Sequence, residues 1–287
     1  MKISVYTCCN NAIENEFTLF EGMMQALRFC DEFVYVDGGS TDGTLEKMEE
    51  FVERDSRIKI YENPWEKRIR KAMTMIQKNI ALSHCSGDWC FLMDADEVYS
   101  DSFCLTVRKL LENIGNEFIA IYIPTYHFYG RFDTICLRDP LLGHSYYKGK
   151  IYGVRNGLGI HHGNADGDHD GFVDNNDVSL KKENTCVLQD SGYVCHFGHV
   201  RSNEKYLIKK NDIERRYYID WKDLERWDFE KILKERSDCF EKIDISLIPS
   251  IMTKRVMETT NEKGFVVHDK VLSYYKRFLG GRNGEDK

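Results

Sequence analysis

Proline is scarce in this sequence, and long apolar runs are missing. The chain has 4 prolines and 21 glycines among 287 residues, which excludes collagen-like, mucin-like and linker sequences. Acidic residues outnumber basic ones, 47 to 40, which argues against a protein that mainly coats nucleic acid. The N-terminal segment MKISVYTCCNN has the pattern of neither a signal peptide nor a membrane span, so we expect a cytoplasmic protein.

The ten cysteines form no CxxC pair, so their spacing predicts no zinc site. Without a signal sequence, we expect reduced and mostly buried thiols rather than disulfides. The content of 42% hydrophobic and 30% charged residues is that of a globular chain long enough to bury a sizeable core.

The first hundred residues alternate between strand and helix patterns. Strands are expected at 2–8, 32–36, 57–61 and 88–93, and helices at 16–30, 44–53 and 66–84. This alternation predicts a mostly parallel sheet with helices on both faces.

The second half is less regular. The pattern predicts a helix at 102–113, a strand at 118–124, an irregular stretch rich in Gly, Tyr and His up to 163, a strand at 193–200, and helices at 203–220, 223–239 and 270–279. We therefore expect a mixed second half followed by a helical end.

Acidic residues follow two of the predicted parallel strands. Asp37 ends the second strand, and Asp94 and Asp96 follow the fourth. The carboxyl ends of parallel strands meet at one edge, so these side chains should face one pocket. Carboxylates suit Mg²⁺ or Mn²⁺, and such a cation could neutralise a departing diphosphate. Taken alone, a D-x-D motif fits a solvated acidic turn equally well.

Three segments together carry a resemblance to a known family. They are the opening strand with Thr7, VDGGSTDGT at 36–44, and GDWCFLMDADE at 87–97. In order and spacing they resemble the family 2 glycosyltransferases of the GT-A fold, over roughly the first hundred residues. The resemblance implies an α/β fold with a mostly parallel, Rossmann-like sheet flanked by helices, a mixed acceptor-side half and a helical C-terminal region.

The resemblance also implies a division of the chain. Residues 1–100 would be the nucleotide-sugar-binding half of a GT-A domain, and 101–201 its acceptor-side half with an acidic insertion at 161–177. Residues 202–287 would form the helical C-terminal region.

The activity implied is a metal-dependent, inverting glycosyltransferase of the hexosyltransferase type. An acceptor hydroxyl, deprotonated by a carboxylate, would attack the anomeric carbon of a nucleoside-diphosphate sugar. The implied cofactor is Mn²⁺ or Mg²⁺. The acceptor is left open as a glycan, a lipid or another hydroxyl compound, with peripheral membrane contact and a nucleic-acid acceptor also open.

The resemblance implies roles for Thr7 and for the acidic residues. Thr7 and Asp37 would hold the base, Asp94 would lie near the ribose and the metal, and Asp96 would bind the metal. Asp37 could instead cap a turn, and Thr7 could be an ordinary strand residue. Glu97 could support the metal shell or touch the acceptor, or it could be an exposed residue that starts a helix.

Two interpretations are open for Arg70, Lys78 and His196. Arg70 and Lys78 would lie near the diphosphate, or else on a solvated helix face. In HFGHVRS, His196 would complete the metal shell and Arg201 would pair with phosphate. A core histidine with one hydrogen bond is the alternative for His196.

The catalytic base is not identified by the sequence. Asp190 is the first candidate, with Asp177 and Glu183 behind it, although Asp190 could be a turn residue. Aromatic residues at 126–129 and 146–147 could form a sugar platform, or belong to the core.

The segment DGDHDGFVDNND departs from the family pattern. It has the spacing of a twelve-residue calcium loop, with ligands from Asp166, Asp168, Asp170, the Phe172 carbonyl, Asp174 and Asp177. Asp177 stands where such loops usually have glutamate. A solvated acidic flap and a flap that supplies the catalytic base are the alternatives.

Two other functions remain. The chain could be a calcium- or carbohydrate-binding module that kept the fold without catalysis. A nucleotidyltransferase is a weaker alternative, because TCCNNAIEN replaces the glycine-rich phosphate loop expected after the first strand.

Overall fold

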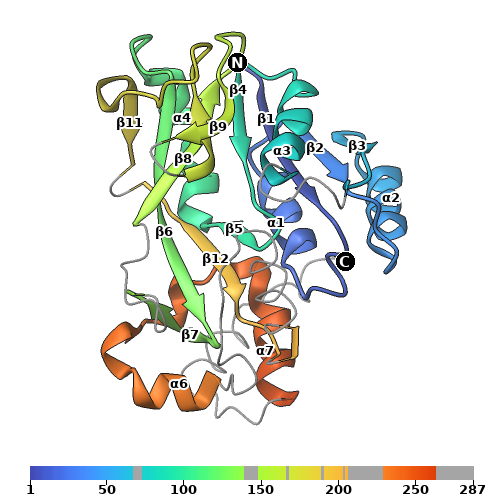
Figure 1. Ribbon diagram of the computed structural model, residues 1–287, viewed down its shortest axis with the longest axis vertical. Coiled ribbons are helices and arrows are strands. Elements are labelled where there is room, and N and C mark those ends of the chain that lie inside the picture. The colour runs from blue at the N-terminus through green and yellow to red at the C-terminus, as the bar shows by residue number, and fades with distance from the viewer. Residues whose placement is uncertain are drawn as a thin grey trace, which may run out of the picture.

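The computed structural model describes residues 1–66, 73–138, 148–165, 168–188, 191–202, 204–205 and 229–262. Eleven of the described strands belong to one sheet, and a separate hairpin consists of β9 (His161–Ala165) and β10 (Asp168–Val173). Figure 1 shows the sheet running through the molecule, with α6 (Phe229–Glu235) and α7 (Thr253–Glu262) at its lower end.

The first part of the sheet is parallel, with strand order β4-β1-β2-β3. The bounds are β1 (Ile3–Cys9), β2 (Glu32–Asp37), β3 (Ile58–Glu62) and β4 (Trp89–Leu92). β1, β2 and β4 are buried along almost their whole length, as their continuous apolar runs require. Cys9 pairs with Asp37 and Tyr6 pairs with Leu92, so the carboxyl ends of these strands share one edge.

Antiparallel strands extend the sheet beyond β4. They are β8 (Gly149–Arg155), β6 (Ala120–Tyr129), β7 (Arg131–Cys136) and β13 (Phe240–Lys242). β8 runs against β4, with Trp89 opposite Arg155 and Phe91 opposite Gly153. The first residues of β8 therefore lie at the carboxyl end of β4.

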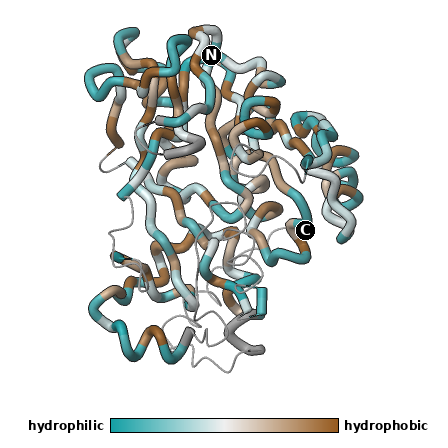
Figure 2. Tube along the Cα trace, in the orientation of Figure 1, coloured by the Kyte–Doolittle hydropathy of each residue, from teal (hydrophilic) through white to brown (hydrophobic). Residues whose placement is uncertain are grey.

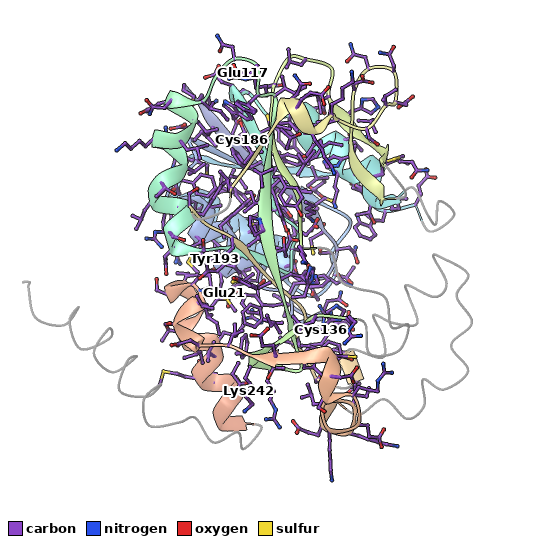
Figure 3. The ribbon with its side chains drawn as sticks, turned by 90° about the vertical axis from the view of Figure 1, so that its left-hand side faces the viewer. Glu21, Glu117, Cys136, Cys186, Tyr193 and Lys242 are labelled. Atoms are coloured by element: carbon purple, nitrogen blue, oxygen red, sulfur yellow. The ribbon has the colours of Figure 1, made fainter. Side chains whose placement is uncertain are left out.

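Two further strands join the sheet around β6. β11 (Thr185–Val187) runs parallel to its beginning, and β12 (Val194–His199) runs parallel to its end. β12 also pairs with the short β5 (Glu97–Tyr99), which places His196 opposite Glu97. β6 is the longest described strand, and Figure 3 shows Cys186 toward one end of the molecule and Lys242 at the other.

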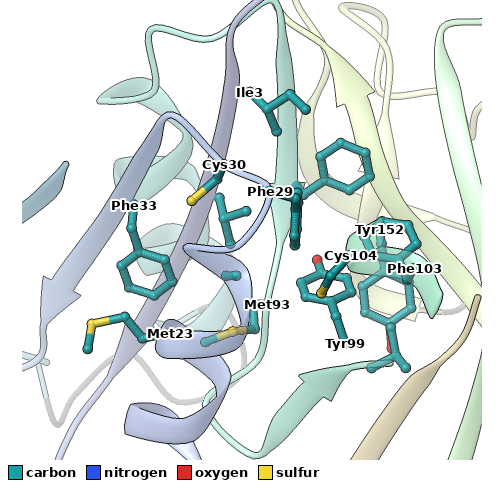
Figure 4. Close-up of a cluster of buried hydrophobic side chains, with 14 of the residues drawn as sticks. Ile3, Met23, Phe29, Cys30, Phe33, Met93, Tyr99, Phe103, Cys104 and Tyr152 are labelled. Carbon is teal, nitrogen blue, oxygen red and sulfur yellow. The ribbon is translucent and has the colours of Figure 1, made fainter. Parts of the chain in front are cut away.

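Helices cover the two faces of the parallel strands. The bounds are α1 (Leu19–Ala26), α2 (Thr44–Arg54), α3 (Met73–Ser83) and α4 (Asp101–Asn113), and the short 3₁₀ helices are η1 (Lys182–Asn184), η3 (Ser237–Cys239), η4 (Ile245–Leu247) and η5 (Ser250–Met252). Alternate side chains of β1 and β2 pack against α1, α2 and α4, while the others pack against α3 and the β9–β10 hairpin. Figure 4 shows the first cluster, in which Phe29 meets Tyr99 and Phe103 edge to face.

The hydropathy pattern follows this layering. In Figure 2, hydrophobic residues concentrate in the central strands, and the loops at the upper end are largely hydrophilic. No helix within the described ranges combines the length and apolar character needed to cross a membrane.

All ten cysteines are free thiols, and eight of them are buried.

The predicted fold class is confirmed: the protein has an α/β fold with a parallel part, a mixed second part and helices on both faces. One expectation was wrong. The stretch up to residue 163, predicted to be irregular, contains β7, β8 and the start of β9. In addition, α1 begins at Leu19 rather than 16, because Glu16 adopts a positive φ of 54° that a helix cannot contain.

Several predicted elements lie outside the described residues, namely most of the helix at 203–220, the helix at 270–279 and the start of the helix at 66–84. Of the predicted helix at 223–239, the described part contains α6 and η3.

Candidate functional site

The acidic turn after β4 is held by the core on both sides. Met93 precedes it and Tyr99 follows it, and both side chains lie in the buried cluster of Figure 4. Within the turn, the Glu97 amide donates to the Asp94 carbonyl (2.9 Å) and the Asp94 amide donates to the Glu97 carboxylate (3.0 Å). These bonds fix the directions in which Asp94 and Asp96 project.

Asp94 lies between two ammonium groups. Its Oδ1 is 2.9 Å from Nζ of Lys78, which comes from α3, and its Oδ2 is 2.5 Å from Nζ of Lys150, which comes from β8. The Lys78 side chain is only 4% exposed. Continuing the β4–β8 register by three residues sets Lys150 opposite Asp94. The sheet itself therefore delivers this lysine to the acidic turn.

Glu97 lies inside the protein, at 1% exposure. Its Oε1 accepts a hydrogen bond from the Tyr152 hydroxyl (2.8 Å) and lies 3.2 Å from Lys150 Nζ. Burial raises the pKa of the Glu97 carboxyl; the Lys150 ammonium opposes this shift and the Asp94 carboxylate adds to it. The reading of Glu97 as an exposed helix-starting residue is wrong, because the residue belongs to β5. Its contacts position the acidic turn.

Asp96 faces the end of β12. Its Oδ1 is 3.6 Å from Nε2 of His196, and its Oδ2 is 3.7 Å from Arg201, a side chain that is 1% exposed. The Asp96 carbonyl accepts the Phe197 amide at 2.7 Å. A Cβ added to Gly198 would lie 2.5 Å from both Asp96 Oδ2 and His196 Nε2. Glycine at 198 therefore lets the Asp96 and His196 side chains lie where they do, and a larger residue would require a shift.

His196 is in turn oriented by a second histidine. Nδ1 of His196 lies 3.0 Å from Nδ1 of His127, a buried residue of β6. The ring of His199 is 5.5 Å from that of His196. A hydrogen bond at Nδ1 leaves Nε2 directed toward Asp96. The sequence had assigned His127 only to a sugar platform or the core.

Asp37 is fully buried in its turn. It accepts hydrogen bonds from the Tyr35 hydroxyl (2.7 Å), the Gly39 amide (2.8 Å), and the amide and hydroxyl of Ser40 (2.7 Å each). These bonds are those of the turn-cap alternative, and they shape the loop at the end of β2. Thr7 is also fully buried, and its hydroxyl has no hydrogen-bond partner among the described residues. Both base-binding roles stay predictions.

The predicted metal ligands divide into two groups. Two ligands about 2.1 Å from one ion lie roughly 3–4 Å apart, so Asp96 and His196, at 3.6 Å, fit a shared Mg²⁺ or Mn²⁺. Mg²⁺ is typically held by one or two carboxylates together with substrate phosphates. Asp94 pairs with two ammonium groups in this structure, so its role as a metal ligand stays a prediction. Within the ranges the structure describes, no three His, Cys, Asp or Glu side chains gather as a metal site.

The predicted calcium loop has a different structure. Residues 168–173 form β10, whose Phe172 is buried with its ring 4.3 Å from that of His162. Asp174 accepts the amides of Asn176 and Val178, which lowers the pKa of its carboxyl. Asp177 contacts His161 at 3.0 Å. Asp168 and Asp170 belong to a strand of this hairpin, and Asp166 lies outside the described residues, so the calcium site stays a prediction.

The remaining candidate residues are either outside the described residues or at the protein surface. Arg70 and Asp190 are outside the described residues. Glu183 is exposed in η1, and its carboxylate lies 4.0 Å from the Lys181 ammonium. The assignment of the catalytic base therefore stays a prediction.

A pocket of about 530 Å³ adjoins the site, with Arg201 in its wall between α1, α2 and α7. Its other charges largely pair within the protein, Arg255 with Glu21 and Lys254 with Glu258. The concentration of reactive groups is thus at the acidic turn rather than in this pocket.

Residues 25–165 match the family model described as Glycosyl transferase family 2. A lipopolysaccharide core biosynthesis glycosyltransferase, LpsC of Rhizobium meliloti (strain 1021), is 36% identical over 83 residues, which cover 29% of this chain and 28% of LpsC. The succinoglycan biosynthesis protein ExoA of the same organism is 32% identical over 104 residues, 34% of this chain and 29% of ExoA. The chain thus matches less than a third of the length of either relative.

Solved structures of similar proteins show lower identity. S. aureus TarS 1-349 in complex with UDP is 17% identical, with a TM-score of 0.46 over 82% of this chain and 70% of that one. The mannosyltransferase PcManGT from Pyrobaculum calidifontis, in complex with GDP-Man and Mn²⁺, is 14% identical, with a TM-score of 0.38 over 97% of this chain and 79% of that one. The family resemblance read from the three motifs is confirmed by the match over residues 25–165.

Proposed function

Because residues 25–165 belong to the family 2 glycosyltransferases, we propose that the chain transfers a hexosyl group from a nucleoside-diphosphate sugar to an acceptor hydroxyl, with inversion at the anomeric carbon. One observation carries the proposal. Asp96, His196 and Arg201 meet at the carboxyl end of β4, beside the lysine-flanked Asp94. Open parallel sheets bind ligands at this edge.

The proposed divalent cation, Mn²⁺ or Mg²⁺, would be held by Asp96 and His196. Bound there, it would supply Lewis-acid neutralisation of the diphosphate charge. The protein's own part is orientation: His127 sets the ring of His196, and Gly198 lets the Asp96 carboxylate approach that ring. Arg201 adds a buried guanidinium beside the same carboxylate.

The transfer needs a carboxylate base on the acceptor side. The acceptor oxygen forms the bond to the anomeric carbon, its proton goes to the base, and the electron pair of the broken bond leaves with the diphosphate. Asp190, just before β12, is the proposed base. Glu97 is not proposed as the base, because its burial and its bonds to Tyr152 and the Asp94 amide commit it to holding the turn.

The first test is a thermal-shift panel of UDP, GDP, dTDP and CMP conjugates with Mn²⁺, with Ca²⁺ and with chelator. A ligand that binds only the folded state raises the melting temperature by mass action. We expect one nucleotide to stabilise the protein in Mn²⁺. Stabilisation by Ca²⁺ alone, without any nucleotide effect, would support the calcium-binding module instead.

Asp96→Asn should lower Mn²⁺-dependent nucleotide affinity and transfer by at least about 100-fold, since loss of even the outer partners of a metal ligand costs about 10- to 100-fold. Asp238→Asn is the matched control, because the Asp238 side chain is 62% exposed and far along the chain from the turn. If Asp96→Asn keeps the Mn²⁺ dependence of the wild type, the metal assignment is wrong.

A further inference from the structure

Lys150 is a charged residue of the site that no motif in the sequence predicts. It is the second residue of β8, and its side chain is 19% exposed. Its Nζ lies 2.5 Å from Asp94 Oδ2, 3.2 Å from Glu97 Oε1 and 4.8 Å from the centroid of the Tyr152 ring. The ammonium is thus fixed from three sides at the carboxyl end of β4.

A second ammonium reaches the same carboxylate from another element. Nζ of Lys78 is 2.9 Å from Asp94 Oδ1. Two ammonium groups near one another repel, and the carboxylate between them offsets this repulsion. Asp94 therefore keeps two cations together, one from the helix side and one from the antiparallel strand.

Such a pair matches the charge of a diphosphate better than that of a single carboxylate. A diphosphate carries at least two negative charges on several acceptor oxygens, and charge-assisted hydrogen bonds from ammonium groups are among the stronger polar contacts. A lysine acts at such a site as a point charge with three donors. An entering diphosphate can thus compete with Asp94 for both lysines.

We propose that Lys150, together with Lys78, contacts the diphosphate of the nucleotide-sugar donor, and that Asp94 positions both ammonium groups. During transfer the leaving diphosphate takes the electron pair of the bond to the sugar and gains one negative charge. Lys150 stabilises this charge from the acceptor-side half of the sheet. This inference rests on the proposed function, because it deepens the description of the same donor site.

The test compares diphosphate and nucleoside binding at a fixed Mn²⁺ concentration. UDP, GDP and dTDP are titrated by calorimetry, and uridine, guanosine and thymidine are followed by ligand-observed NMR, which detects weak binding. Lys150→Gln should weaken the diphosphate that the wild type binds by about 10- to 100-fold, the loss of a charged hydrogen bond. It should leave binding of the parent nucleoside unchanged.

Two further variants separate charge from folding. Lys150→Arg keeps the positive charge and should retain most of the diphosphate affinity. Lys148→Gln is the matched control, since Lys148 lies two residues earlier and is exposed; it should bind like the wild type.

Each outcome of this test either supports or overturns the role of Lys150. If Lys150→Gln binds the diphosphate as the wild type does, or loses nucleoside binding to the same degree, the inference is overturned while the proposed function stands. If the wild type binds none of the three diphosphates, both are overturned.

Discussion

Gly198 shows how a single missing side chain shapes the site. Its backbone passes so close to the acidic turn that an added Cβ would lie 2.5 Å from Asp96 Oδ2 and from His196 Nε2. Both atoms belong to the proposed metal pair, so the clash is relieved by a shift of one of these side chains or of the backbone at residue 198.

Gly198→Ala should therefore separate Asp96 from His196 with little effect on the rest of the fold. A displacement of about 1 Å in a reacting site can cost about 100-fold in rate, and we expect a loss of transfer of that order. The check is transfer activity beside a melting curve and Mn²⁺ affinity measured on the same variant. Unchanged Mn²⁺ affinity would show that the two side chains do not act together.

At the same scale, the sequence predicted some of the site and missed other parts of it. Asp94 and Asp96 could be assigned because they directly follow a buried strand, and the edge that a strand ends on is fixed by its direction. Of the two lysines that pair with Asp94, Lys78 was a candidate from the sequence and Lys150 was not. Lys150 reaches it only through the antiparallel register of β8 with β4, which local sequence does not encode.

At the scale of elements, the predicted and missed strands differ in pattern. The parallel strands β1, β2 and β4 are largely apolar and are covered on both faces by helices or the hairpin. The segments RFDTIC of β7 and KGKIYGVR around β8 mix charged residues and glycine with apolar ones. Pairing with neighbours over a long range, rather than composition, decides that such segments are strands.

At the other edge of the parallel sheet, where the strands begin, one carboxylate links neighbouring strands. Glu32 begins β2 and accepts hydrogen bonds from the Ser4 hydroxyl of β1 (2.6 Å) and from the amide of Ser86 (2.8 Å), just before β4. Burial would raise the pKa of the Glu32 carboxyl, but these bonds and the charge of Lys2 outweigh it and hold the pKa below its ordinary value. Three neighbouring strands are thus joined at their amino ends.

A carboxyl with a lowered pKa stabilises the fold only while it is ionised. The stabilisation by Glu32 is therefore present above the ordinary pKa of a glutamate, about 4.3, and is lost as the pH falls through its lower folded pKa. Glu32→Gln should cost about 1–3 kcal/mol at pH 7, with the gap to the wild type closing in acid. Urea unfolding at several pH values measures this. Glu53→Gln, at an exposed position of α2, is the control, and a gap that does not depend on pH would contradict the linkage.

At the scale of the whole molecule, distant parts of the chain close over the segment between β1 and α1. Arg201, after β12, donates to the Asn15 carbonyl at 3.0 Å. Arg255 of α7 donates to the carbonyls of Glu16 (3.3 Å) and Phe17 (3.0 Å) and pairs with Glu21 at 2.7 Å. Because this segment begins at the edge where β1 and β2 end, α7 supports a loop next to the proposed donor site.

Arg255→Gln should consequently loosen that segment as well as lower global stability. Loss of the partly buried guanidinium, with its carboxylate and carbonyl partners, should cost about 1–3 kcal/mol in unfolding free energy. Amide exchange at residues 15–17 should accelerate more than exchange in β1, since local opening precedes global unfolding. Lys254→Gln is the matched control: that side chain is 87% exposed and pairs only with Glu258 among the described residues, so a change of less than about 0.5 kcal/mol is expected. Equal effects of the two variants would mean that α7 does not hold the segment through Arg255.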